Sequence, residues 1–253
     1  MGDSMRLLEG KTAVVTGCNR GIGKAIIKSF AENGVTKLFA IIRKENPDFN
    51  SYISELEETF GISVSAFYAD FSEEEQVEAA AKQILSTKQP IDILVNNVGT
   101  SYPLRMFTMI KSEESKHVCQ INYFSPILLT QILTRGMVRH KKGNVVFISS
   151  MAAYDAFSNL EYCASKGAIN SATIRLAHEL GNFGIRVNAV APSLTDSGAA
   201  DNMSLEDQET AISRNILHRK ALPEEIADVV TYLSSDMASF ITAQIIRVDG
   251  GLR

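Results

Sequence analysis

A short apolar stretch, followed by a glycine-rich turn and a helical repeat, constrains the fold of this chain more than any other feature. The stretch KTAVV is apolar and β-branched, which is typical of a buried strand. Glycines let a chain turn tightly and let a diphosphate approach the backbone, and a helix N-terminus supplies N–H donors. The order of strand, turn and helix therefore predicts a dinucleotide site, with an ordinary glycine turn as the alternative. The turn reads Thr16-Gly17-Cys18-Asn19-Arg20-Gly21-Ile22-Gly23 and leads into KAIIKSFAENG; its spacing is G-x-x-x-G-x-G rather than the commoner G-x-G-x-x-G.

The rest of the chain alternates strands with helices and shows no linker rich in proline or serine. This alternation predicts an α/β fold: a doubly wound parallel sheet of about seven strands with helices on both faces, in a single domain over residues 1–253. Helices are expected over 21–33, 73–86, 160–181 and 223–234, and in most other intervals. We expect strands near 12–16, 37–42, 62–69, 91–95, 143–149, 185–191 and 244–248.

Several polar or small residues follow directly after expected strands. Gly17, Asn96, Ser150 and Pro192 each stand at such a position. Ligands of parallel sheets bind beyond the carboxyl ends of the strands, where the strand order reverses. We therefore expect these residues to converge in space although they are far apart in the sequence.

Tyr162 and Lys166, four residues apart in YCASKGAI, are the strongest candidates for chemistry. On a helix, positions i and i+4 share a face, so the ammonium is expected beside the phenol. A neighbouring cation favours the phenolate and lowers a pKa that is ordinarily about 10. A phenol tuned in this way can exchange a proton with an alcohol or a ketone near neutral pH. By itself the pair also fits a solvated tyrosine and lysine.

Composition excludes some classes of protein without pointing to one function. The net charge of −4 and the absence of a basic cluster argue against nucleic-acid binding. No apolar run reaches the length of a membrane span, and no signal peptide precedes the first strand, so we expect no membrane partner. Neither the four histidines nor the three cysteines show metal-ligand spacing, so no metal is expected. Reduced thiols predict a cytoplasmic protein.

In combination, these motifs resemble those of the short-chain dehydrogenase/reductase family, over about residues 8–252. The glycine turn is similar to the family's cofactor loop in a Rossmann-type domain. Asn96-Asn97-Val98-Gly99 resembles its NNAG element, with valine in place of alanine. Further landmarks are the segments NAVAP at 188–192 and VDGG at 248–251. The length and the RVDGG ending are most similar to the 3-oxoacyl-(acyl carrier protein) reductase branch.

The resemblance implies roles for individual residues. Asn122, Ser150, Tyr162 and Lys166 match the catalytic tetrad of the family. In that role Tyr162 gives a proton to a carbonyl oxygen that Ser150 polarises, and Lys166 holds the cofactor's ribose and lowers the tyrosine pKa. Asn122 positions a water that resupplies protons. The implied cofactor-binding residues are Gly17, Asn19, Arg20, Gly21, Ile22, Gly23, Arg43, Asp70, Asn97, Gly99, Tyr162, Lys166, Pro192, Thr195 and Ser197.

The charge near the second strand predicts NADP(H) as the cofactor. NAD-preferring relatives place an acid there to bind the ribose hydroxyls, whereas KLFAII ends in Arg43-Lys44. A guanidinium can engage a 2′-phosphate through two parallel hydrogen bonds, and Arg20 matches a second basic position. Two solvated surface arginines are the alternative. Asp70 matches the aspartate that contacts adenine, and a role as helix cap is compatible with that.

Two adjacent serines compete for one catalytic position. Ser149 and Ser150 face opposite ways on an extended strand. Alignment from Gly143 selects Ser150, although Ser149 gives the commoner spacing to Tyr162. We favour Ser150.

The sequence determines the identity of the substrate less well than any other property of the site. Ser193 replaces the usual glycine after Pro192, which leaves the local backbone open, and residues near 194–220 resemble a mobile substrate lid. NADPH-dependent reduction of a ketone is the preferred reaction, with a 3-oxoacyl-(acyl carrier protein) as its leading substrate. His178 stands where carrier-docking relatives often have arginine, so a sugar, steroid-like or secondary-metabolite carbonyl is equally open. Alcohol oxidation in the reverse direction and a non-catalytic NADP-binding redox sensor are the remaining alternatives.

Assembly is predicted by resemblance alone. Many relatives pair long helices, here near 105–139 and 160–181, in a four-helix dimer interface. The segment 223–253 forms a second interface in them. A homotetramer, or a homodimer, is therefore expected.

Overall fold

The computed structural model describes residues 6–197 and 203–252, and its centre is a sheet of seven parallel strands. The spatial order is β3-β2-β1-β4-β5-β6-β7, so the order reverses between β1 and β4. Each neighbouring pair runs parallel. The strands are β1 (Thr12–Thr16), β2 (Lys37–Ile42), β3 (Ser63–Tyr68), β4 (Ile93–Asn96), β5 (Gly143–Ile148), β6 (Ile185–Pro192) and β7 (Ile245–Val248).

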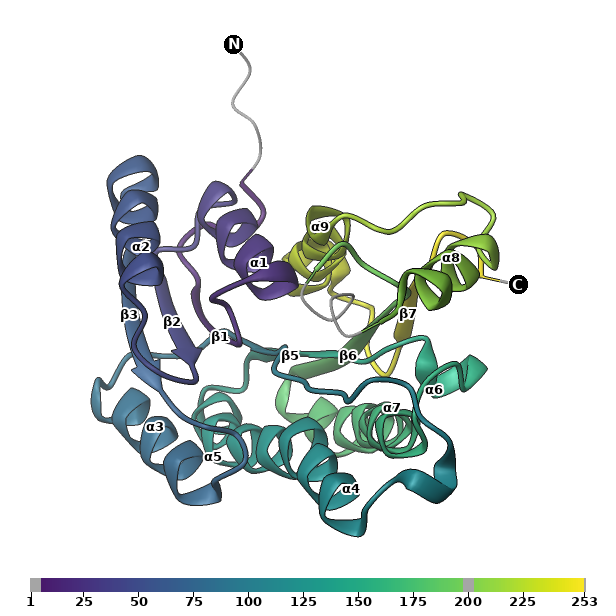
Figure 1. Cartoon of the computed structure of the whole chain (residues 1–253). Coiled ribbons are helices and arrows are strands. Elements are labelled where there is room, and N and C mark those ends of the chain that lie inside the picture. Colours follow the sequence, from purple (N-terminus) through teal and green to yellow (C-terminus); the bar gives the residue numbers. More distant parts are fainter. Residues whose placement is uncertain (1–5, 198–202, 253) are drawn as a thin grey trace.

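Helices cover both faces of this sheet (Figure 1). On one face, α1 (Gly21–Glu32), α2 (Pro47–Phe60) and α9 (Pro223–Ser234) pack over one buried apolar cluster. On the other, α3 (Glu74–Ser86), α5 (Ser125–His140) and α7 (Leu160–Leu180) cover a second cluster. The central strands are buried on both sides because of this arrangement, which explains their nearly continuous apolar sequences. The predicted α/β class, doubly wound with helices on both faces, is confirmed.

The bounds of the predicted elements agree with the structure to within two residues, with one exception. A continuous helix near 105–139 is wrong, because the helical segment begins only at Ser112. It consists of α4 (Ser112–Cys119), a π-helical turn (Gln120–Phe124) and α5. The amide of Lys111 donates to the Glu114 carboxylate at 3.1 Å, which satisfies a donor at the N-terminus. The preceding residues contain only a 3₁₀ turn (Phe107–Met109).

Shorter elements complete the part of the chain that the structure describes. Helix α6 (Ala152–Asp155) follows β5, and α8 (Leu205–Ser213) lies in the segment predicted as a lid. Residues 198–202 of that segment lie outside the described residues. Two further 3₁₀ turns span Gly181–Phe183 and Asp236–Ala238. Among the described helices, none combines the length and the apolar character needed to cross a membrane.

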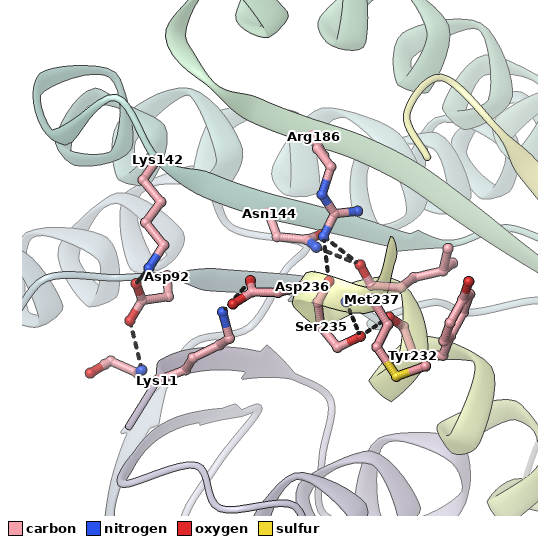
Figure 2. Close-up of polar contacts among 11 residues, drawn as sticks. Lys11, Asp92, Lys142, Asn144, Arg186, Tyr232, Ser235, Asp236 and Met237 are labelled. Carbon is pink, nitrogen blue, oxygen red and sulfur yellow. Dashed lines mark hydrogen bonds and ion pairs between the residues drawn. The ribbon is translucent and has the colours of Figure 1, made fainter. Parts of the chain in front are cut away.

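A polar network ties the amino ends of the strands to the end of α9 (Figure 2). Arg186 donates to the backbone carbonyls of Leu233, Ser235 and Ile241 at 2.8–3.1 Å. Lys11, which is 9% exposed, pairs with Asp236 at 2.8 Å. These contacts lie at the opposite edge from the strand ends that were predicted to bind a ligand, so we interpret the network as structural.

Candidate active site

The predicted site residues converge on one cavity of about 810 Å³ at the carboxyl ends of the strands. The cavity lies where the strand order reverses, between the chain segments that leave β1 and β4. Of the predicted catalytic residues, Ser150, Tyr162 and Lys166 line it. The predicted cofactor-binding residues also line it: Gly17, Asn19, Arg20, Gly21, Ile22, Gly23, Arg43, Asp70, Asn97, Gly99, Pro192, Thr195 and Ser197.

The glycine turn fits a dinucleotide because side chains are sterically excluded from it. Gly17 and Gly21 have φ of 65° and 53°, in the left-handed region that favours glycine. At Gly23, an added Cβ would overlap the Gly17 carbonyl oxygen and lie 2.6 Å from Nδ2 of Asn97. The turn ends at the N-terminus of α1, which begins at Gly21 and offers backbone N–H donors toward a diphosphate.

Asn97 and Thr16 connect β1 and β4, the two strands between which the strand order reverses. Nδ2 of Asn97 donates to the carbonyls of Thr16 and Gly17 at 2.9 and 3.0 Å. In return, Oγ1 of Thr16 accepts from the amides of Asn97 and Val98 at 2.9 and 3.0 Å. Thr16 is fully buried and was not among the predicted site residues. Its position directly before the first glycine was the signal that could have identified it.

Tyr162 and Lys166 share a face of α7, as predicted, but the phenol is not tuned as predicted. Nζ of Lys166 lies 5.8 Å from the centre of the Tyr162 ring and donates to the carbonyl of Ile148 at 2.8 Å. Burial raises the pKa of Tyr162, and a hydrogen bond from Ser150 opposes this only in part. Burial also lowers the pKa of Lys166 from 10.5 to about 8. The expected lowering of the tyrosine pKa is therefore wrong for this structure, because desolvation of the phenolate is the larger effect.

The two adjacent serines point to different partners. The Ser150 side chain is hydrogen-bonded to the Tyr162 phenol and lines the cavity. Oγ of Ser149 instead donates to Oδ1 of Asn170 at 2.6 Å, and its side chain is buried. This geometry favours Ser150 as the residue facing a substrate carbonyl.

Asn122 lies behind the cavity wall rather than in it. It belongs to the π-helical turn, and its Nδ2 donates to the Thr100 carbonyl and to Oγ of Ser165 at 2.9 and 3.0 Å. Its Oδ1 accepts from the Thr100 amide at 2.8 Å. A Cβ added to Gly99 would lie 3.3 Å from Nζ of Lys166 and 3.6 Å from Oδ1 of Asn122. The glycine thus lets both side chains approach the same point of the backbone.

One end of the cavity carries positive charge near Asp70. Backbone and side-chain hydrogen bonds from Ser72 lower the pKa of Asp70, and Arg43 contributes to this shift. Oδ1 of Asp70 accepts from the Ser72 amide at 2.9 Å. The N-cap of α3 is Glu73, so the idea that Asp70 caps this helix is wrong; it stabilises the preceding turn. Arg43 and Arg20 are exposed at the same rim.

The other end of the cavity is formed by the segment that follows β4 and by α6. Ser101, Tyr102, Leu104 and residues of α6 line it. Ser193 also lines the cavity and is absent from the left-handed residues of the described chain, so serine is tolerated there without backbone strain. Sequence reasoning missed Arg214, which closes this end from the C-terminus of α8, because no motif marks that position.

Comparison with known proteins decides the family. A model of the short-chain dehydrogenases, described as enoyl-(acyl carrier protein) reductase, matches residues 17–253. The chain belongs to the short-chain dehydrogenase/reductase family. Like other members, this short-chain dehydrogenase/reductase is an oxidoreductase that acts on CH–OH or C=O groups.

Individual relatives of this short-chain dehydrogenase/reductase differ in what they act on. The 3-oxoacyl-(acyl-carrier-protein) reductase FabG of Thermotoga maritima is 35% identical, over 97% of this chain and 98% of that protein. A 3α-hydroxysteroid dehydrogenase of Mediterraneibacter gnavus is 34% identical, over 98% of both chains. A structure described as an NAD(P)-dependent gluconate 5-dehydrogenase of Beutenbergia cavernae, with NADP bound at low occupancy, has a TM-score of 0.88 and 30% identity over 98% of both chains.

Proposed function

We propose that this enzyme reduces a ketone to a secondary alcohol with NADPH, and that Tyr162 donates the proton. The observation that carries this proposal is that Ser150, Tyr162 and Lys166 line one cavity, with the Lys166 ammonium 5.8 Å from the Tyr162 ring and Ser150 close enough to the phenol to lower its pKa. A phenol whose pKa burial raises is protonated at neutral pH, so it can act as an acid. The Ser150 hydroxyl is placed to hydrogen-bond the same substrate oxygen.

The reduced nicotinamide, when bound, supplies the hydride. Gly17, Gly21 and Gly23 would hold its diphosphate, and Tyr162 and Lys166 its ribose. With a pKa of about 8, Lys166 exchanges a proton more readily than an exposed lysine and is suited to reprotonate the phenol. Asn122, tied to the Thr100 backbone, fixes the wall against which Lys166 packs.

The preference for NADP over NAD rests on charge. Arg43 follows β2 directly and lines the cavity, and no acid stands at that point. Arg20, in the glycine turn, adds a second cation at the rim. The relative from Beutenbergia cavernae that binds NADP supports this assignment by similarity.

The identity of the ketone is open among three classes. A 3-oxoacyl group on an acyl carrier protein is the leading form, in line with the relative from Thermotoga maritima. Steroid and sugar-acid carbonyls are the alternatives, in line with other relatives. The same side chains can also catalyse alcohol oxidation, which is the second candidate reaction. A non-catalytic NADP-binding sensor is disfavoured because Tyr162 and Lys166 are both present and face the cavity.

A substrate panel with one variant tests the proposal. NADPH consumption is measured with acyl, alicyclic and sugar-acid ketones, for the wild type, for Tyr162→Phe and for Tyr68→Phe as a control outside the cavity. Loss of a general acid lowers turnover by about 10²–10⁴-fold, so Tyr162→Phe is expected to be nearly inactive while it still binds NADPH. Full turnover by Tyr162→Phe, or no turnover of any ketone by the wild type, contradicts the proposal.

Assembly and compartment extend the proposal. We infer a homotetramer, or a homodimer, in the cytoplasm. Exposed apolar side chains support assembly on two surfaces: Phe124 and Ile174 on the helical side, and Met237 and Phe240 in the C-terminal segment after α9. Light scattering at several protein concentrations tests this, and a monomer at every concentration contradicts it.

A further inference from the structure

Arg214 is a cation in the cavity that the proposed reaction does not use. It is the C-cap residue of α8 and lines the cavity from the substrate end. The other lysine and arginine side chains of the described lining lie in parts of the cavity away from Arg214. Lys166 stands beside Tyr162, and Arg20 and Arg43 flank the end near Asp70. Arg214 therefore places a positive charge on the wall that a substrate contacts.

The guanidinium of Arg214 is held in one orientation by two neighbours from the opposite wall. Nη2 lies 3.1 Å from Oδ2 of Asp155, at the end of α6. The guanidinium carbon lies 4.7 Å from the centre of the Phe157 ring. The other carboxylate oxygen of Asp155 accepts from the Phe157 amide at 3.0 Å, so Asp155 is itself fixed. A guanidinium braced in this way loses little entropy when it forms further hydrogen bonds.

Some N–H donors of the Arg214 guanidinium are not used by Asp155. A guanidinium has five N–H donors in a planar fork, and Asp155 engages only Nη2. Within residues 6–197 and 203–252, Nε and Nη1 of Arg214 make no hydrogen bond. Asp155 would repel a second carboxylate, but that carboxylate would contact the guanidinium directly. The attraction acts over the shorter distance and dominates.

Apolar side chains line the cavity that Arg214 also lines, and the Phe157 ring contacts its guanidinium. They lower the local dielectric constant, which strengthens a charge-assisted hydrogen bond. They also favour a substrate whose carbon frame is apolar rather than rich in hydroxyl groups. The apolar residues that line the cavity include Leu104, Met151, Phe157, Met203 and Leu252.

We propose that Arg214 binds a carboxylate of the substrate, so that the enzyme acts on keto acids with an apolar frame. This inference rests on the proposed reduction of a ketone and narrows its substrate class. The alternative is that the Arg214–Asp155 ion pair is purely structural and only connects α8 to α6. The two explanations differ in how activity depends on the charge of the substrate. A purely structural ion pair would affect the turnover of keto acids and neutral ketones alike.

Matched acids and esters separate the two explanations. The probes are 4-oxopentanoate, 6-oxoheptanoate and 4-oxocyclohexanecarboxylate, each with its methyl ester. The readout is the ratio of kcat/KM for acid over ester with NADPH. In the wild type we expect a preference for at least one acid of about tenfold or more, which a hydrogen bond to a charged group provides. Arg214→Met is expected to abolish this preference. Arg175→Met, which removes an exposed arginine–glutamate pair on α7, is the matched control and is expected to keep it.

A binding measurement complements the kinetics. With NADP present, the preferred acid is expected to raise the Tm of the wild type more than its ester does, and this difference is expected to vanish in Arg214→Met. Arg214→Lys, which retains the charge, is expected to recover part of the preference. An equal loss for acid and ester in Arg214→Met, or no acid preference in the wild type, overturns the inference while ketone reduction stands. If no ketone is reduced at all, the proposed function itself fails.

Discussion

Nζ of Lys166 lies 5.8 Å from the centre of the Tyr162 ring, one helical turn away, and donates to the Ile148 carbonyl at the end of β5. The ammonium is buried and donates only this one hydrogen bond within residues 6–197 and 203–252, which explains why the pKa of Lys166 falls to about 8. The helix thus brings the two groups together, while burial opposes charge on both.

The buried lysine makes stability depend on pH. Between about pH 8 and pH 10, the unfolded chain keeps the Lys166 proton and the native state loses it. Because the unfolded state then binds more protons, this contribution to stability rises with pH. It amounts to about 2 kcal/mol from about pH 7.5 to pH 9.5. Urea unfolding at the two pH values is expected to show this gain for the wild type relative to Lys166→Met. An identical pH dependence of the two proteins contradicts the burial of a charged ammonium.

The two serines are expected to fail in different ways. Ser150→Ala removes the hydrogen bond to the Tyr162 phenol, so kcat is expected to fall by about tenfold or more, with little change in stability. Ser149→Ala removes the bond to Asn170 and is expected to cost about 1 kcal/mol of stability, with a smaller effect on kcat. Steady-state kinetics and urea unfolding of both variants test this. A larger loss of turnover in Ser149→Ala would reverse the assignment.

Arg43 is expected to decide between the two cofactors. Arg43→Ser is expected to weaken NADP binding by about tenfold or more, because a charge-assisted hydrogen bond to the 2′-phosphate is lost, while NAD binding changes little. Lys44→Ser is the control, since Lys44 is exposed and does not line the described cavity. Thermal stabilisation by each nucleotide measures the effect. Equal stabilisation of the wild type by NADP and NAD would show that the charge argument fails.

Gly23 is expected to tolerate no side chain. A Cβ there would overlap the Gly17 carbonyl oxygen and crowd Asn97, so Gly23→Ala is expected to abolish nucleotide-induced stabilisation and to lower the Tm. Gly136→Ala makes the same chemical change within α5, where nothing lies within 4 Å of the new Cβ. It is expected to stabilise the helix by up to about 1 kcal/mol. Nucleotide binding by Gly23→Ala at wild-type strength would contradict the proposed role of the glycine turn.

Arg186 is expected to matter for stability alone. It donates to three carbonyls at the amino edge of the sheet, and the Leu233 and Ile241 carbonyls also accept from Asn144 and Asn188. Arg186→Met therefore deprives mainly the Ser235 carbonyl, at a cost of about 1–3 kcal/mol. KM and kcat are expected to stay unchanged, because Arg186 does not line the described cavity. A change in KM without loss of stability would assign this network a different role.

The sequence determined the fold class and most of the cavity lining. Strand and helix periods are local, and glycine turns record local steric demands, so β1, β2 and α9 have the predicted bounds. The carboxyl ends of parallel strands must meet, which is why Gly17, Ser150 and Pro192 could be placed together in advance.

Only the tertiary structure decided the electrostatics and the far wall of the site. The tyrosine pKa depends on how completely neighbouring segments exclude water, and spacing along a helix does not reveal this. The turn Gln120–Phe124 is π-helical and holds Asn122 near Gly99 through contacts made across the fold. Arg214 meets Asp155 although 59 residues separate them, because α6 and α8 fold over the same cavity. A contact between residues so far apart leaves no local pattern in the sequence, so no motif could have predicted it.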